Sequence, residues 1–515
     1  MGSVLALLTE DLHWIGFQRL APELVLLVVS LVVLTMDLVW RERDSWKLGA
    51  ISIGGLAIAA FCLVVAFDGS VGETAFGLVV VDKFGNFFKL FTCAALAIVM
   101  VFVMNDRRER KHRIGEYYFL LLGAAIGIFF MVGTNNLLLL VIGLELLSLA
   151  SYSLAGFHKG EKRSAEAAMK YVVFGGLSAG VLVYGVSLLY GLTGTLDLRV
   201  MAGTLAAPEG EGVARSLAQA VTDSPVAVAV AMVLILGGFS YKISVAPFHF
   251  WAPDVYEGAP TPVTTFLAVA SKAAGFGALL RFLAMLFAGA GTEGPVADYG
   301  LQVGQLIALL AAVTMTVGNF AALRQESVKR MLAYSSVAHA GYVLVGVVAL
   351  NQAGFEAAML YLVAYYLMNL GAFGFLLYFA GQTGEETYES LNGMGYRAPV
   401  ISIAMVVFLI SLTGLPPTVG FFGKYKLAEA ALAVHGGAYG WLVLCMLLNS
   451  VVSLWYYIRV ARHLFLMEPA ERGVTPQRAL TSTLVVLAVL NVAFLLYSEP
   501  LSAWTSSSMD LLGPP

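Results

Sequence analysis

The chain has 515 residues, of which 59% are hydrophobic and 12% are charged, and its mean hydropathy is +0.83. Soluble domains carry about 25% charged residues, so this composition excludes an ordinary soluble enzyme and indicates an all-α polytopic membrane protein. The net charge of −3 offers no basic surface to a nucleic acid, and the three cysteines follow no spacing typical of a disulfide framework or an iron–sulfur site.

About fourteen apolar stretches of roughly 20 residues, each long enough to cross the hydrocarbon core, follow one another along the chain. Their approximate centres are residues 31, 58, 95, 124, 145, 179, 238, 276, 312, 340, 368, 416, 451 and 488. The residues before the first stretch lack the basic start of a cleavable signal peptide, so we expect the protein to insert by its own helices.

Basic residues cluster in the short connecting segments, which predicts the orientation of the helices in the membrane. The basic segments are residues 41–47, 105–113, 158–163, 324–330 and 459–463. With fourteen helices all five fall on one side, so we expect that side to be cytoplasmic and both termini to be periplasmic. The acidic segment 381–398 falls on the same side; it is either a tolerated exception or a contact surface for a soluble partner.

Two predicted helices are interrupted by proline, at Pro247 and at Pro416–Pro417. An interior proline removes a backbone hydrogen bond, and in lipid the freed carbonyls must be satisfied by protein or by water in a cavity. About five helices separate the two breaks, and paired broken helices are typical of inverted repeats in transporters. Each kink alone would also be explained by packing.

We therefore expect two inverted five-helix repeats, each with one proline-broken helix. The predicted units are three leading helices in residues 1–116, a first repeat in 117–290, a second repeat in 301–465, and a last helix with a tail in 479–515.

Four ionisable residues lie deep within apolar stretches: Glu145, Lys242, Lys272 and Lys424. Such a group costs at least roughly 2.5–3.5 kcal/mol to insert, which makes it a functional-site hypothesis. Burial disfavours the charged ammonium, so a buried lysine can load and release a proton as neighbouring charges change. We expect Glu145 to partner Lys242. The alternative, a lysine whose ammonium reaches the membrane interface, is a poor fit for Lys242 and Lys272, which lie near the middle of their stretches.

Weaker candidates lie nearby in the sequence. Lys170 either connects Glu145 to the interior or reaches the membrane surface, and His339 either bridges the two halves or is a structural histidine. His249 and Asp254, beyond the first break, mark a possible entrance region.

Other ionisable residues are expected to have no part in transport. Lys89 and Lys426 fit an interfacial position, Glu23 is expected to be solvated, and Lys329 and Arg330 are interpreted as topology determinants. No Walker loop, dinucleotide fingerprint, HExxH or CxxCH motif occurs, so we expect no nucleotide, metal or redox centre in this chain.

Four long motifs resemble the antiporter-like subunits of complex I, the proton-pumping NADH:quinone oxidoreductase. They are VAPFHFWAPDVYEGAPTPVTTFLAVASKAAGFGALLRF (245–282), KRMLAYSSVAHAGYVLVG (329–346), GLPPTVGFFGKYKL (414–427) and NSVVSLWYYIRVARHLF (449–465). The chain is most similar to the N type (chain 2) of this family. This assignment depends on the motif PDVYEGAPTPVTTFLA and on the absence of a long lateral helix after the last span. The resemblance extends from about residue 20 to 498.

The resemblance implies a role for each buried charge. Glu145 matches the fifth-helix glutamate, Lys242 the seventh-helix lysine that pairs with it, Lys272 the connecting lysine of the eighth helix, and Lys424 the lysine of the broken twelfth helix. It implies no cofactor in this chain, with NADH, FMN, iron–sulfur clusters and quinone in partner subunits.

It also implies a place in the cell. The partners would be the antiporter-like subunit M, the small K- and J-type subunits and the bilayer of a bacterial inner membrane. Two alternatives remain open: a subunit of a multi-subunit cation/proton antiporter, and the equivalent subunit of a ferredoxin-fed photosynthetic complex.

Overall fold

The structure, a computed structural model, describes residues 18–40, 45–65, 72–74, 77–106, 114–205, 215–288, 294–468 and 475–509. Most charged residues of the predicted loops 41–47 and 105–113 lie outside these ranges, as do residues 1–17.

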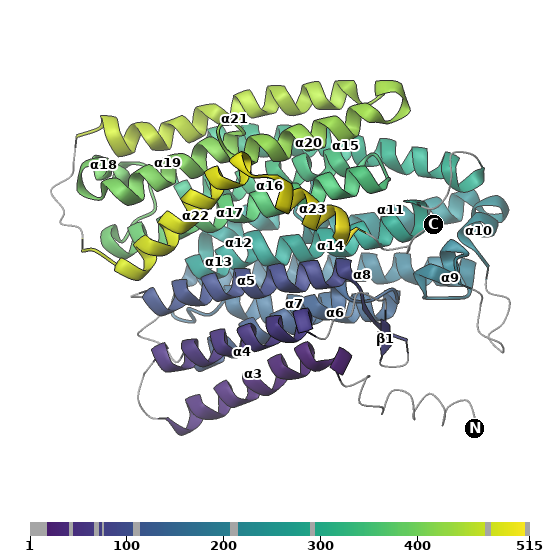
Figure 1. The fold of residues 1–515 in the computed structure, drawn as a ribbon, viewed down its shortest axis with the longest axis horizontal. Coiled ribbons are helices and arrows are strands. Elements are labelled where there is room, and N and C mark those ends of the chain that lie inside the picture. The colour runs from purple at the N-terminus through teal and green to yellow at the C-terminus, as the bar shows by residue number, and fades with distance from the viewer. Residues whose placement is uncertain are drawn as a thin grey trace.

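Long helices lying side by side form a single bundle (Figure 1). Twelve helices of the described residues are long and apolar enough to cross a membrane, or thirteen if one bent pair counts as a single span. The predicted all-α membrane fold is therefore confirmed. The count of fourteen and the inverted repeats stay predictions.

The first helices form one edge of the bundle, drawn in purple in Figure 1, where α3 packs against α4 and α6. The elements are α3 (Ala21–Val39), α4 (Ser45–Val65), β1 (Gly72–Thr74), β2 (Val79–Val81) and α5 (Lys83–Asn105). The two strands pair antiparallel, with Glu73 opposite Val80.

The next part of the chain contains the first proline break. Its elements are α6 (Gly115–Val132), α7 (Leu137–Ala155), α8 (Lys162–Thr193), α9 (Leu198–Ala202), α10 (Leu217–Asp223), α11 (Pro225–Lys242), α12 (Trp251–Gly258), α13 (Thr261–Phe266), the π-helical segment η2 (Leu267–Ser271), α14 (Lys272–Leu283) and a second π-helical segment η3 (Ala284–Ala288).

The last part contains the second break. Its elements are α15 (Pro295–Leu323), α16 (Val328–Val347), α17 (Gln352–Thr383), η4 (Glu389–Leu391), α18 (Met394–Arg397), α19 (Pro399–Thr413), α20 (Val419–Ala433), η5 (His435–Gly437), α21 (Gly440–Leu466), α22 (Arg478–Leu496) and α23 (Glu499–Ser508). Both breaks lie where the prolines predict them, between α11 and α12 and between α19 and α20.

At the first break, two backbone groups near the end of α11 form hydrogen bonds with side chains. The Trp251 indole donates to the Tyr241 carbonyl at 2.9 Å, and the N–H of Ala246 donates to Thr314 Oγ1 at 3.0 Å. At the second break Gly414 ends α19 with φ +85°, a backbone conformation that favours glycine.

Helix α17 is the central support of the second part. Its apolar stretch is buried throughout, and it packs against α13, α16, α19, α20 and α22. Because other helices surround α17, polar side chains on any of its faces point into the protein interior.

Two buried ion pairs join helices in this region: one connects α3 with α5, and the other connects the start of α5 with α14. Lys89 lies 2.6 Å from Glu23, and Arg281 donates to both oxygens of Asp82 at 2.7 and 2.8 Å. Glu23 is only 4% exposed and Lys89 only 1%, so the expected solvated and interfacial positions of these two residues are wrong. Neighbouring helices cover both side chains of the pair. The sequence position of Glu23 near a helix end does not reveal this burial.

We expect Arg281→Met to destabilise the protein by about 3–5 kcal/mol, because it leaves the Asp82 carboxylate buried without its cation. The double variant Asp82→Asn/Arg281→Met removes both charges and keeps a helix-capping side chain on α5, so it should recover much of this loss. Thermal unfolding of the purified membrane protein in detergent measures the difference. A double variant no more stable than the single one would contradict the pairing.

Candidate functional site

Three lysines and one histidine from four different elements lie buried in the interior. Lys242 is the last residue of α11, Lys272 directly follows the π-helical segment η2, His339 lies on α16, and Lys424 lies on α20. Their exposed fractions are 2%, 2%, 1% and 7%. Because π-helical turns occur frequently at functional sites, the position of Lys272 supports a special role.

Lys242 is held by a hydroxyl group. Its ammonium donates to Ser148 Oγ at 3.1 Å, and Ser148 lies almost one turn after Glu145 on α7. Among the described residues no carboxylate oxygen lies within 4.0 Å of Lys242 Nζ. Glu145 is half-buried, interacts electrostatically with Lys242, and keeps one buried oxygen without a hydrogen-bond partner. The two charges are therefore neighbours without direct contact.

Lys272 is held by Ser336 of α16. Its ammonium donates to the Ser336 carbonyl at 2.7 Å and to Ser336 Oγ at 2.5 Å. The Tyr365 hydroxyl of α17 donates to the same Ser336 Oγ at 2.7 Å. A hydroxyl that contacts two proton-carrying groups can pass a proton in either direction.

His339 occupies the space between Lys272 and Lys424, and it interacts electrostatically with both. Its Nδ1 lies 2.7 Å from the Tyr361 hydroxyl and its Nε2 lies 3.3 Å from the Tyr457 hydroxyl. Both ring nitrogens therefore have oxygen partners, and which of them carries the proton depends on the tautomer.

Lys424 lies across the second break. Its ammonium donates to the Thr413 carbonyl at 2.8 Å and to Ser450 Oγ at 2.8 Å, and it lies 4.3 Å from the centre of the Tyr342 ring. The last carbonyls of a helix lack partners within the helix, so a cation at this position satisfies them. The break thus creates the acceptors that hold the lysine.

Two glycines make room for these lysines. A Cβ added to Gly275 on α14 would lie 3.2 Å from Lys242 Cγ and 2.8 Å from Ile243 Cγ2. A Cβ added to Gly414 would lie 2.7 Å from Lys424 Cδ. The lysine stems are therefore packed directly against neighbouring backbone.

The weaker candidates lie apart from this line. The Lys170 ammonium is 2.7 Å from Glu166 and 2.7 Å from Asp254, and its side chain is 38% exposed. Asp254 also pairs with Arg330 at 2.9 Å. His249 is buried against Phe250, and its Nδ1 has no hydrogen-bond partner in the described part of the chain.

The sequence analysis did not predict the hydroxyl groups that contact these charged side chains and His339. They are Ser148, Ser336, Ser450, Tyr361, Tyr365 and Tyr457. A usable signal existed for some of them: Ser336 lies three residues before His339, and Tyr361 and Tyr365 are four residues apart, which places each pair on one helix face. No group of three or more His, Cys, Asp or Glu residues within the described ranges is placed to hold a metal ion.

We expect Gly275→Ala to destabilise the protein by about 1–3 kcal/mol, because the added methyl group overpacks the contact with Lys242 and Ile243. Gly123→Ala on α6 is the matched control: a Cβ there meets nothing within 4 Å, so the higher helix propensity of alanine should leave stability unchanged or slightly raised. Thermal unfolding in detergent compares the two. Equal midpoints would refute the tight packing of Lys242.

Comparison with known proteins identifies relatives of the whole chain. The family described as NADH:quinone oxidoreductase/Mrp antiporter, TM, matches residues 134–453. The chain is 38% identical over 499 residues to NADH-quinone oxidoreductase subunit N of Chlorobium chlorochromatii (96% of this chain, 94% of that protein). It is 41% identical over 506 residues to NADH-quinone oxidoreductase subunit N 2 of Sorangium cellulosum (96% and 97%).

A solved structure is similar over nearly the same length. A chain of respiratory complex I from Thermus thermophilus with bound aureothin superposes with a TM-score of 0.76 at 32% identity, covering 94% of this chain and 99% of that chain.

Proposed function

We propose that protons cross this chain along its buried lysines, since the chain belongs to the family of NADH-quinone oxidoreductase N subunits. It is an antiporter-like, proton-translocating membrane subunit of an NADH:quinone oxidoreductase. Other membrane subunits of that complex are its partners, and the redox cofactors reside in other subunits.

One observation supports the lysines as carriers: each of them is held by uncharged acceptors. Lys242 is bound to Ser148, Lys272 to Ser336, and Lys424 to Ser450 and the Thr413 carbonyl. An ammonium paired with a carboxylate cannot lose its proton without leaving a buried unpaired anion, which costs several kcal/mol. An ammonium bound to neutral oxygens carries no such penalty, so its proton can leave.

The order of the groups suggests a route. A change in charge at Glu145 alters the electrostatic balance of Lys242, and the proton then passes to Lys272 and its partner Ser336. His339 and its tyrosine partners continue the line to Lys424, from which the proton leaves on the opposite side. Lys170 pairs with Glu166 and Asp254 instead, so we assign it no transfer step.

Three further features belong to this proposal. The chain acts as part of a translocase and carries no redox centre of its own. It resides in a bacterial inner membrane, with the basic segments on the cytoplasmic side and both termini on the periplasmic side. Residues 117–290 and 301–465 are two inverted repeats, which is consistent with the two broken helices α11/α12 and α19/α20.

Replacement of Lys424 by methionine in the intact complex should lower NADH-driven proton translocation by at least threefold while the complex still assembles. Methionine keeps the unbranched stem but carries no proton. Lys426→Met is the matched control on the same helix: Lys426 pairs with Glu429 at 2.7 Å and is 36% exposed, so its loss should have little effect. Proton uptake by reconstituted vesicles, normalised to assembled complex, measures both variants. Equal rates in the two variants would remove Lys424 from the route.

The subunit composition of the native assembly tests the function itself. We expect mild detergent extraction to recover flavin and iron–sulfur subunits together with NADH:quinone activity. Ferredoxin-dependent activity in place of NADH oxidation would indicate the photosynthetic relative, and an assembly lacking every redox subunit would indicate an ion-gradient antiporter.

A further inference from the structure

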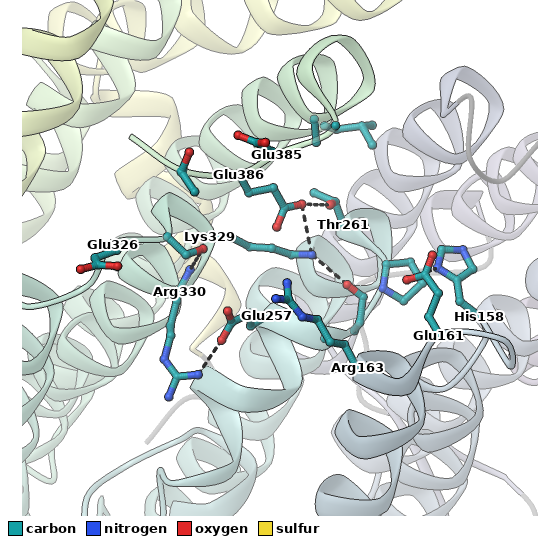
Figure 2. A pocket seen from close by; sticks show the side chains of 18 of the residues that line it. His158, Glu161, Arg163, Glu257, Thr261, Glu326, Lys329, Arg330, Glu385 and Glu386 are labelled. Atoms are coloured by element: carbon teal, nitrogen blue, oxygen red, sulfur yellow. Dashed lines mark hydrogen bonds and ion pairs between the residues drawn. The ribbon is translucent and has the colours of Figure 1, made fainter. Parts of the chain in front are cut away.

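A large cavity opens on the face that carries the basic segments, between the two parts of the bundle (Figure 2). Its volume is about 660 Å³, and its lining includes Glu257, Thr261, Lys329, Arg330, Glu385 and Glu386. At about 30 Å³ per water molecule it can hold on the order of twenty waters. We call it the basic-face cavity.

At the floor of this cavity the Glu386 carboxylate connects three segments: the segment after α17, helix α16 and helix α13. Glu386 Oε1 lies 3.5 Å from the Lys329 ammonium and accepts a hydrogen bond from Thr261 Oγ1 at 3.2 Å. The same ammonium donates to the Ala259 carbonyl at 2.8 Å. Dashed lines in Figure 2 join Glu386 to Lys329 and to Thr261. Lys329 is only 3% exposed, so this residue is part of the protein interior and not a surface topology signal alone.

The backbone fixes Glu386 in this position. The segment after α17 forms an antiparallel bridge to the start of α16, with Ser327 opposite Thr387 and the N–H of Val328 donating to the Glu386 carbonyl at 2.9 Å. The Glu386 side chain therefore points into the cavity floor, where it is 18% exposed, while the neighbouring Glu385 is exposed. The inward contacts of Glu386 argue against a partner surface at this part of the acidic segment.

Buried hydroxyl groups continue from the floor towards Lys272. Thr264 and Thr265 follow Thr261 on α13 and are fully buried. Tyr256 on α12 is also buried; its hydroxyl interacts with Ser336 without the geometry of a full hydrogen bond. Ser336 Oγ in turn accepts from Lys272. The eleven residues from Thr261 to Lys272 correspond to roughly 16 Å of helix, a length that these hydroxyls and a few waters can bridge.

We propose that Glu386 is a residue through which protons enter this chain from water in the basic-face cavity, in addition to those that reach Lys272 from Lys242. The carboxylate takes a proton from a hydronium ion in the cavity water and leaves a water molecule, while the Lys329 ammonium keeps its hydrogen bond to the Ala259 carbonyl. The proton then passes by way of the Thr261 hydroxyl and the buried Tyr256 and Ser336 hydroxyls to Lys272 in its neutral form. Glu386 is left as carboxylate for the next cycle. This inference rests on the proposed function, because Lys272 is its acceptor.

Glu386→Gln in the whole complex provides the test, with NADH oxidation and proton translocation measured in reconstituted vesicles. Glutamine keeps the shape and can still accept from Lys329 and Thr261, but it cannot bind a proton. We expect translocation to fall at least threefold, with the amount of assembled complex and its thermal midpoint unchanged. Glu386→Asp, which retains an acid, should restore part of the rate. Glu385→Gln, the adjacent exposed residue on the same cavity wall, should transport protons like the parent protein.

Lys272→Met, tested in parallel, separates failure of this inference from failure of the proposed function. Normal translocation in Glu386→Gln together with loss in Lys272→Met would overturn Glu386 as the entrance and leave the lysine route intact. Normal translocation in both variants would overturn the route itself. An equal loss in Glu385→Gln and Glu386→Gln would also refute the proposal, since it would show a general effect of cavity charge.

Discussion

The cost of burying a cationic side chain is the constraint on which this structure depends, because each such group must find acceptors in the interior. Lys89 and Arg281 face carboxylates at 2.6–2.8 Å, and these pairs connect α3 with α5 and the start of α5 with α14. The lysines of the central line face hydroxyls and carbonyls instead. The same physical requirement thus yields two kinds of site: cations paired with carboxylates, and ammonium groups held by neutral oxygens, which the proposed proton route needs.

The helix arrangement supplies those neutral acceptors. The break after α19 leaves the Thr413 carbonyl free to bind Lys424. The π-helical segment before α14 places Lys272 next to Ser336 of α16. Helix α17, enclosed on all sides, contributes Tyr361 and Tyr365 between them. The irregular backbone therefore occurs where it serves the polar groups, as a membrane interior requires.

The sequence alone predicts the charged groups better than their partners. Lys242, Lys272 and Lys424 stand out because few ionisable residues occur in apolar stretches, and the prolines locate the breaks. Serine and tyrosine are ordinary residues in membrane helices, and one sequence does not reveal which distant helices face each other, so their hydroxyls went unnoticed. The same lack of tertiary information made the expectation for Glu23 wrong and hid the inward position of Glu386.

The glycines beside the lysines affect how fast the lysine side chains can reorient. With Gly275 against the Lys242 stem and Gly414 against the Lys424 stem, neither side chain can swing far unless a neighbouring helix moves as well. Rotamer changes of free side chains take picoseconds to nanoseconds, whereas helix displacements take microseconds to milliseconds. Large reorientations of these ammonium groups are therefore expected on the slower, microsecond-to-millisecond timescale.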